Sequence, residues 1–309
     1  MSASAIKTRV GFLGLGTMGT PMARRLAKNN PLTVWNRSAL QSRYEPLKHL
    51  GAKIGDKPAD VLNQSDVTFT MLFDGAAIKS IMTDDFKESL RGKTLINTSS
   101  VPVEFSQYLD RYVRDAGGEF LEMPVSGSKV PAEQGKLVGL MAGDPKVAER
   151  VKPLVEPLTT VAVFCGPIGS GLKMKYALNL YLTTMNAGLA ESMNLARAQG
   201  LDLEAFATAL DAGPMASPYS KIKTTKMLHQ DWSPQASARD CYNSTQLIRA
   251  AVEETGTQSP LALLSASLYR QAIESGWGDE DMISIYKVLQ QPFDQNTKGE
   301  TKRDPANDS

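Results

Sequence analysis

The chain contains little cysteine and almost no histidine. Its 309 residues include two cysteines, Cys165 and Cys241, and two histidines, His49 and His229. Two cysteines do not build a disulfide framework, which favours a reducing compartment. Neither histidine has a partner at metal-ligand spacing, so we expect no metal site and no histidine acting as a catalytic base.

The sequence also lacks an excess of charge of either sign and any long apolar run. Its formal net charge of +1 gives no field that would attract nucleic acid or an anionic membrane. No stretch reaches the roughly 18 apolar residues of a membrane span, and the first residues lack the apolar segment of a signal peptide. We therefore expect a cytoplasmic protein that acts on a small molecule and binds neither nucleic acid nor a membrane.

Short apolar segments alternate with helical patterns through the first half of the chain. Strands separated by helices predict βαβ units, and right-handed crossovers then give a doubly wound, mostly parallel α/β sheet. A helix is expected over residues 21–29, after the first strand. The strands are expected at residues 9–13, 32–35, 67–72, 94–97, 119–122, 137–141 and 161–164.

After Cys165 the pattern becomes helical. Residues 172–199 contain no proline and carry apolar residues at helical spacing, which predicts a single long helix ending at Gly200. Such a helix is better explained as a strut between domains and subunits than as a lone surface helix, so we expect a homodimer or higher homo-oligomer. Further helices are expected at 202–210, 236–254, 260–274 and 280–289.

These patterns divide the chain into two domains and a tail. We expect a nucleotide-binding sheet domain over residues 1–165 and an all-helical domain for substrate binding and dimerisation over 166–290. Residues 291–309 are polar and charged without periodicity, which predicts disorder.

A glycine-rich motif follows the first expected strand. A strand before it and a helix after it are the context of a dinucleotide-binding fingerprint. Gly14 permits a tight turn, Gly16 lets the backbone approach a pyrophosphate, and Gly19 lets the helix pack closely on the strand. The pyrophosphate is expected at the helix N-terminus, where free N–H groups favour an anion. The motif has the form G-x-G-x-x-G and consists of Gly14, Leu15, Gly16, Thr17, Met18 and Gly19.

The end of the second expected strand indicates which dinucleotide binds. An NAD site usually has Asp or Glu here to bind the ribose 2′-hydroxyl, whereas this chain has Asn36, Arg37 and Ser38. An arginine pairs with a 2′-phosphate, which a carboxylate would repel. We therefore expect NADP(H) rather than NAD(H), with these three residues at its ribose.

A second glycine-rich motif opens the long helix. Residues 166–179 have the form G-x-x-G-x-G-x-x-x-K-x-x-x-N, which places Lys175 and Asn179 one turn apart on one helical face. We expect the glycines to let a ligand come close to the backbone, and the two side chains to hold one oxygen atom between them. Lys173 points to a different face and is expected to be a surface charge.

With these residues in place, the chain resembles the β-hydroxyacid dehydrogenase family over about residues 10–289. The resemblance implies a Rossmann-type domain joined by a long helix to a helical domain, and hydride transfer between a nicotinamide and a 3-hydroxy acid, a semialdehyde or a related small carbonyl compound. It implies that Ser100 and Arg239 lie near the cofactor, and we add Leu72 to this set. The motifs that carry it are the cofactor motif, Asn97-Thr-Ser-Ser100, Met123-Pro-Val-Ser-Gly127, residues 166–179 and Arg239-Asp240.

The resemblance also implies how the site works. Lys175 is the general acid in reduction and the general base in oxidation. A lysine ordinarily titrates near about 10.4, so a base role near neutral pH requires burial or nearby positive charge to lower its pKa. The residues expected to bind the substrate are Ser126, Gly127, Ser128 and Asn179.

Several residues depart from the family pattern, mostly around the substrate. Glu122 stands in place of an aspartate, Ser128 in place of a second glycine, and Arg239 in place of a lysine. Pro131-Ala132 replaces the usual Gly-Ala. These departures leave two alternatives open: an imine reductase or reductive aminase on the same scaffold, and a catalytically silent NADP-binding protein. Lys175 argues against the first, and the intact glycine loop and lysine argue against the second.

Overall fold

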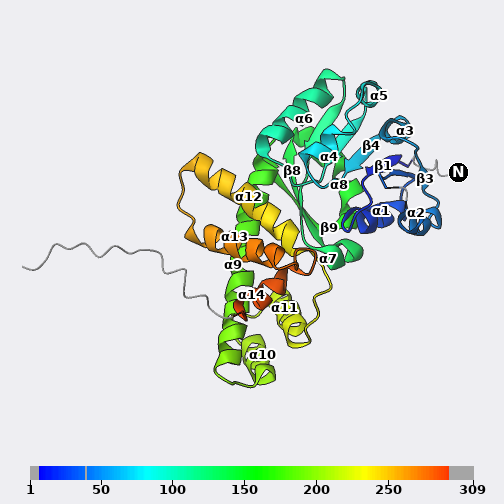
Figure 1. Ribbon diagram of the computed structural model, residues 1–309. Helices are drawn as coiled ribbons and strands as arrows, with labels where there is room; N and C mark the ends of the chain where they lie inside the picture. Colours follow the sequence, from blue (N-terminus) through cyan, green and yellow to red (C-terminus); the bar gives the residue numbers. More distant parts are fainter. Residues whose placement is uncertain (1–6, 39, 292–309) are drawn as a thin grey trace, which may run out of the picture.

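A computed structural model gives the structure of residues 7–38 and 40–291, so nearly all of the tail expected to be disordered lies outside the described residues (Figure 1). A nine-stranded sheet occupies the first half of the chain, in the order β3-β2-β1-β4-β5-β6-β8-β7, with β9 also paired to β8. The strands from β3 to β6 are parallel, β8 is antiparallel to β6 and β7, and β9 is parallel to β8. The strands are β1 (Val10–Leu13), β2 (Leu32–Trp35), β3 (Lys53–Ile54), β4 (Val67–Thr70), β5 (Thr94–Asn97), β6 (Glu119–Glu122), β7 (Val125–Ser126), β8 (Leu137–Gly143) and β9 (Thr159–Gly166).

The expected mostly parallel sheet is therefore confirmed, with differences at several strands: β8 and β9 each end two residues after their expected ends, and β9 also begins two residues earlier. The two-residue strands β3 and β7 are too short to leave a period-2 pattern in the sequence. Strand β4 ends at Thr70, two residues before the expected end.

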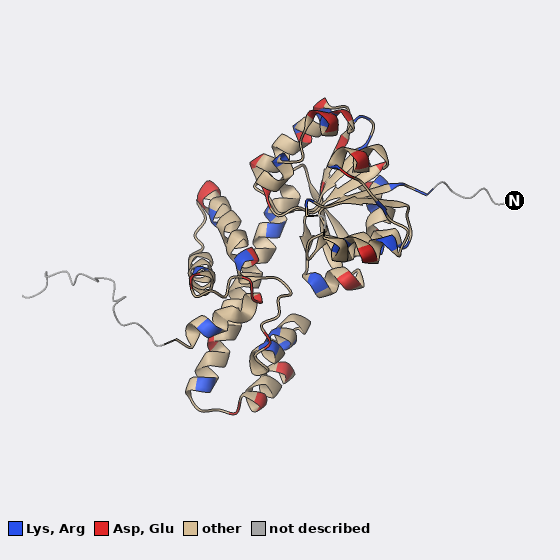
Figure 2. Ribbon diagram, turned by 45° about the vertical axis from the view of Figure 1, so that its right-hand side comes forward, with Lys and Arg blue, Asp and Glu red and all other residues tan. Residues whose placement is uncertain are grey.

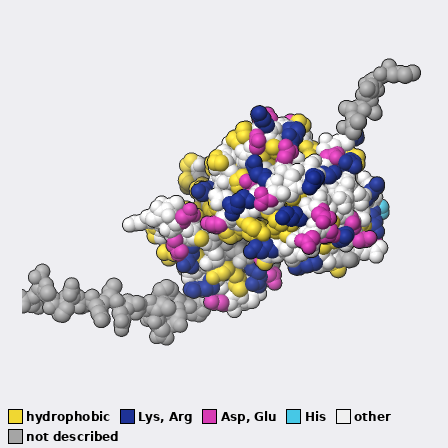
Figure 3. Space-filling view, turned by 90° about the horizontal axis from the view of Figure 1, so that it is seen from above, with side chains coloured by type: hydrophobic (Ala, Val, Ile, Leu, Met, Phe, Trp, Pro, Cys, Tyr) yellow, Lys and Arg dark blue, Asp and Glu magenta, His cyan; other side chains and the backbone are white. Residues whose placement is uncertain are grey.

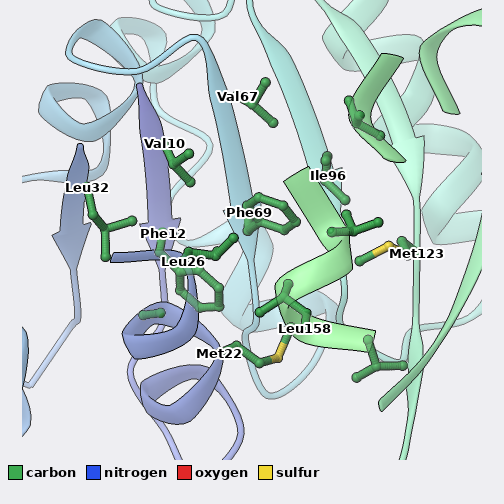
Figure 4. Packing of buried hydrophobic residues seen from close by; sticks show 14 of the residues in the cluster. Val10, Phe12, Met22, Leu26, Leu32, Val67, Phe69, Ile96, Met123 and Leu158 are labelled. Atoms are coloured by element: carbon green, nitrogen blue, oxygen red, sulfur yellow. The ribbon is translucent and has the colours of Figure 1, made fainter. Parts of the chain in front are cut away.

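Helices cover both faces of the sheet, as a doubly wound fold requires. The core on one face contains side chains of α1, α2, α7 and α8, and the core on the other contains side chains of α3 to α6. In the first core, Phe12 of β1 stacks on Phe69 of β4, and Met22 and Leu26 of α1 lie in the same cluster (Figure 4). These helices are α1 (Gly19–Ala27), α2 (Gln41–Lys48), α3 (Pro58–Asn63), α4 (Gly75–Lys79), α5 (Asp84–Glu88), α6 (Val103–Asp115), α7 (Lys129–Gln134) and α8 (Pro145–Val155).

The second half is helical, and the long helix is confirmed. Helix α9 runs from Ser170 to Ala198, and Gly200 follows it in the left-handed conformation that ends helices. The other helices pack around α9 below the sheet (Figure 1). They are α10 (Leu203–Ala212), α11 (Pro218–Leu228), α12 (Ala238–Thr255), α13 (Pro260–Glu274) and α14 (Ile285–Leu289).

Two features of the second half differ from the expected pattern. Helix α11 is not among the expected helices; Pro218 occupies its first turn, where proline is tolerated, and Ser217 caps the helix. The single helix expected over 280–289 is a 3-10 turn over Met282–Ser284 followed by α14.

Charges of both signs are interspersed over both halves of the molecule (Figures 2 and 3). Among the described residues, no helix is both long and apolar enough to cross a membrane.

Candidate active site

The first glycine motif forms the turn between β1 and α1. Gly14 has a φ of 101°, and a Cβ there would lie 2.2 Å from the carbonyl oxygen of Met71. A Cβ on Gly19 would lie 1.9 Å from the carbonyl oxygen of Gly14. By contrast, a Cβ on Gly16 would meet no atom within 4 Å. The first and third glycines are thus required by the protein itself, whereas the second leaves open space for a ligand.

This contrast predicts that two similar substitutions act on different properties. Gly19→Ala should lower the free energy of unfolding by about 2–3 kcal/mol in urea denaturation, because its Cβ overlaps the backbone. Gly16→Ala should leave stability within about 0.5 kcal/mol of wild type and raise the Kd for NADPH at least about tenfold. Wild-type NADPH affinity in Gly16→Ala would show that no pyrophosphate approaches this turn.

A groove of about 170 Å³ opens beside this turn, at the carboxyl ends of the strands. Arg37 lines it as expected, and so does Arg43 of α2, which the sequence analysis missed. Asn36, Ser38 and Leu72 also lie in its wall. Two arginines at one groove provide the charge that a phosphate needs.

The Asn36 side chain forms hydrogen bonds within the protein itself. Its side-chain oxygen accepts from Leu15 N–H at 2.8 Å, and its side-chain nitrogen donates to the Ser38 carbonyl at 2.8 Å. The side chain of Leu15 points into the core, while Thr17 is exposed and Met18 is the cap of α1. Asn36 therefore braces the turn that carries the glycines.

The segment after β5 lies beside the groove wall. Ser99 Oγ accepts from the backbone N–H of Leu72 at 2.9 Å, whereas Ser100 is half-buried. The Asn97 side-chain oxygen accepts from Thr70 at 2.9 Å, and its buried side-chain nitrogen has no partner among the described residues. Ser99, rather than Ser100, fixes the backbone at Leu72.

The glycines of the second motif serve a different purpose from the one expected. A Cβ on Gly171 would lie 2.4 Å from the Leu140 carbonyl oxygen and 2.9 Å from Glu122 Oε1, and a Cβ on Gly169 would lie 2.8 Å from Val103. Protein atoms fill the space at both glycines, so the expectation that a ligand approaches the backbone there was wrong. These glycines let α9 begin against the sheet.

Glu122, at the end of β6, holds that helix end in place. Its carboxylate is fully buried and accepts from Ser106 Oγ at 2.5 Å, Gly169 N–H at 3.0 Å and Leu172 N–H at 2.9 Å. Burial raises the pKa of Glu122, and these hydrogen bonds oppose the rise. A carboxylate at a helix N-terminus is also favoured by the helix dipole. The residue that seemed only a departure from a family pattern is thus an anchor for α9.

Lys175 and Asn179 follow this anchored turn and are both buried. Lys175 is 9% exposed, and burial lowers its pKa from 10.5 to about 8. The nearby Cys241 thiol opposes that shift, but burial raises the pKa of Cys241 to about 12, so the thiol is neutral. Asn179 donates from its side chain to Ser244 Oγ on α12 at 3.2 Å. Lys173 is exposed, as expected.

A pKa near 8 predicts opposite pH profiles for the two directions of a hydride-transfer reaction. In the expected role of Lys175 as general acid, the protonated form is the active one, so the reduction rate should fall tenfold per unit as pH rises above about 8. In the expected role of general base, the neutral form is the active one, so the oxidation rate should rise with pH and level off above about 8. Steady-state rates between pH 6 and 10 test this, and a reduction rate that stays constant over that range contradicts it.

The loop of Ser126, Gly127 and Ser128 lies next to the start of α9. Strand β7, which ends at Ser126, contacts α9, and Pro124 packs against Gly171, one helical turn before Lys175. Gly127 has a φ of 128°, and Ser128 precedes α7 in an extended conformation. The structure therefore places the loop against the first turns of α9, the helix that carries Lys175.

Arg239 lies at the start of α12 in the helical domain, and it is not among the residues that line the groove beside the first glycine motif. Its side chain pairs with Asp279 at 3.1 Å and packs against Gly278.

Comparison with known proteins relates both halves of the chain to one group of enzymes. The family model described as the NAD binding domain of 6-phosphogluconate dehydrogenase matches residues 9–166. The model described as NAD-binding of NADP-dependent 3-hydroxyisobutyrate dehydrogenase matches residues 169–289.

Individual relatives agree with these family matches. Glyoxylate/succinic semialdehyde reductase 1 of Arabidopsis thaliana is 33% identical over 91% of this chain and 98% of its own length. The structure of 3-hydroxyisobutyrate dehydrogenase from Mycobacterium tuberculosis with L-serine has the same fold, with a TM-score of 0.80 at 22% identity, over 93% of this chain and 100% of that one. An imine reductase from Myxococcus stipitatus in complex with NADP+ has a TM-score of 0.60 at 22% identity, over 91% and 100% of the two chains.

Proposed function

The chain belongs to the β-hydroxyacid dehydrogenase family and is an NAD(P)-dependent dehydrogenase or reductase of that type, and we propose that it reduces a small aldehyde acid with NADPH. The observation that carries this proposal is the buried Lys175 at the start of α9, with a lowered pKa and Asn179 one turn away. A perturbed lysine beside a polar loop is the arrangement that proton transfer to a carbonyl oxygen needs.

The preference for NADPH rests on the groove beside the first glycine motif. Open space at Gly16 admits a pyrophosphate, and Arg37 and Arg43 supply positive charge where a 2′-phosphate would lie. No carboxylate lines that groove among the described residues, so nothing there would repel the phosphate.

The substrate class rests on the loop beside Lys175 and on the relatives. Successive backbone N–H groups at Gly127 and Ser128, with the Ser126 hydroxyl, suit a carboxylate. The relative from Arabidopsis is named for glyoxylate and succinic semialdehyde, which both carry an aldehyde and a carboxylate. We therefore propose aldehydes of this kind as substrates.

In this mechanism the protein donates a proton and orients the substrate. The nicotinamide, when bound, supplies the hydride. Lys175 donates its proton to the carbonyl oxygen as negative charge develops there, and its location in a buried site strengthens that interaction. Asn179, whose side-chain nitrogen donates to Ser244, presents its remaining polar atoms to the same oxygen or to the substrate carboxylate.

An NADPH-consumption panel tests the function. It contains glyoxylate, succinic semialdehyde, methylmalonate semialdehyde, bulkier ketones and preformed cyclic imines. We expect turnover of the first three. Turnover of imines alone would overturn the proposal in favour of the imine reductase alternative, whose fold is similar.

We also propose that a second copy of the chain covers part of α9. Met174, Leu178 and Tyr181 are exposed along one stripe of this helix, which continues through the small residues Gly188 and Ser192 to the exposed Leu195. In an antiparallel pair of helices, the large residues at one end of the stripe lie over Gly188 and Ser192 of the other copy, as a two-fold interface requires.

Light scattering at micromolar concentration should therefore give at least a dimer mass. Tyr181→Lys should shift this mass to that of a monomer. Tyr181 is 70% exposed, and a lysine at this position in each copy would bring two positive charges into the interface. Tyr108→Lys, at an exposed tyrosine of α6, is the control and should leave the mass unchanged. A monomeric wild-type protein refutes the interface.

The compartment is proposed to be the cytoplasm or another reducing one. Cys165 and Cys241 are both free thiols in the structure. Fractionation with a tagged chain tests this, and recovery from a secreted fraction contradicts it.

A further inference from the structure

Residues 231–237 form most of the connection between α11 and α12, and we call this segment the strap. Its backbone is bonded to the segment before α14: Asp281 N–H donates to the Trp232 carbonyl and Met282 N–H to the Ala236 carbonyl, both at 2.9 Å. Just after the strap, Ala238 N–H donates to the Glu280 carbonyl at 2.9 Å. These bonds fix the strap along one side of the helical domain.

A buried ion pair lies beneath the middle of the strap. Lys223 Nζ lies 2.7 Å from Asp281 Oδ1, and both side chains are excluded from solvent. The Asp281 carboxylate also accepts from the backbone N–H groups of Gln235 at 3.0 Å and Ile283 at 3.1 Å. A buried ion pair adds little net stability, because loss of hydration offsets the attraction, so its main effect here is to fix positions.

Gln235 is the residue that this pair fixes. Its N–H is bound by Asp281, and its side-chain oxygen lies 3.5 Å from Lys223 Nζ. Its carbonyl oxygen then points out of the helical domain and accepts from Lys129 N–H at 3.3 Å. Lys129 is the first residue of α7 and directly follows Ser128.

We propose that Gln235, held by the Lys223–Asp281 pair, is a positioning residue that keeps the Ser126–Ser128 loop in place opposite Lys175. The N–H of a first helical residue has no partner inside its own helix, so it is free to bind a group from elsewhere. Through this bond the helical domain sets the place of the substrate loop, which belongs to the sheet domain. The inference rests on the proposed function, because it assigns the loop to the substrate.

One pair of variants isolates the bond. Lys129→Pro removes the backbone N–H together with the lysine side chain, and it is compatible with the fold because proline is tolerated at the first position of a helix and the extended Ser128 permits a following proline. Lys129→Ala keeps the N–H and removes the same exposed side chain with its weak contact to Glu133. Comparison of the two separates the hydrogen bond from every side-chain effect.

Steady-state kinetics with succinic semialdehyde and glyoxylate give the main measurement. Relative to Lys129→Ala, Lys129→Pro should raise KM for the aldehyde about tenfold and leave KM for NADPH and the melting temperature unchanged. A merely structural role would lower the melting temperature without this selective change in KM. An aldehyde KM within twofold of that of Lys129→Ala overturns the proposal.

A second measurement keeps the inference separate from the proposed function. If the wild-type protein reduces neither aldehyde, the proposed function fails, and amide hydrogen exchange then tests the bond alone. Peptides covering residues 123–128 have the same sequence in both variants and should exchange about tenfold faster in Lys129→Pro. Equal exchange rates in the two variants overturn the proposal.

Discussion

Replacing Lys175 with alanine is expected to lower kcat by about a thousandfold while NADPH still binds. A positioned general acid or base contributes about 10²–10⁴-fold, and alanine also removes the positive charge that stabilises the developing alkoxide. Because Lys175 is buried, water or an exposed side chain does not readily replace it as the proton donor. Single-turnover kinetics measure the chemical step, and fluorescence titration with NADPH measures cofactor binding.

Lys173→Ala is the matched control. It removes the same side chain two residues earlier on the same helix, from an exposed position, and should leave kcat within twofold of wild type. The assignment of Lys175 fails if Lys175→Ala retains a near-wild-type kcat, or if both variants lose activity equally.

Replacing Arg37 with aspartate should raise KM for NADPH about 100-fold and change KM for NADH by less than about threefold. In the proposed NADPH complex, the substitution would remove a hydrogen bond to the charged 2′-phosphate and bring a carboxylate to it, whereas NADH lacks this phosphate. Arg43 also lines the groove and keeps its positive charge in this variant, so the loss of NADPH affinity should be large but incomplete.

Arg24→Asp provides the same change of charge at an exposed position of α1 outside that groove. It should alter KM for NADPH only slightly, because exposed charges are screened by salt. Equal effects of Arg37→Asp on both cofactors would remove the basis for the NADPH preference.

The sequence was most informative where local spacing determines structure. Alternating apolar segments predicted the parallel sheet, and the absence of proline over 172–199 predicted α9 almost to the residue. The spacing of Lys175 and Asn179 placed them on one buried face of that helix, since i and i+4 are neighbours in any helix.

The failures have a common physical cause, which is contact between segments far apart in the chain. Nothing local to Gly171 shows that Leu140 and Glu122 fill the space beside it, so its glycine was attributed to a ligand. Arg43 lies at the groove because α2 packs against α1 and its Tyr44 is hydrogen-bonded to the backbone of Asn36. Helix α11 was missed because a proline can either break a helix or begin one.

The anchoring of α9 by Glu122 has a mechanical consequence. Leu172 and Tyr176, on either side of Lys175 in the first turns, pack in the same core as Leu95 and Phe120 of the sheet, and Tyr176 donates to the Val101 carbonyl at 2.6 Å. The Lys175 side chain is therefore held on the half of the molecule that carries the groove beside the first glycine motif. We therefore expect any bending between the two halves to occur beyond Tyr176 along α9, which would move the strap relative to the groove and leave Lys175 fixed against the sheet.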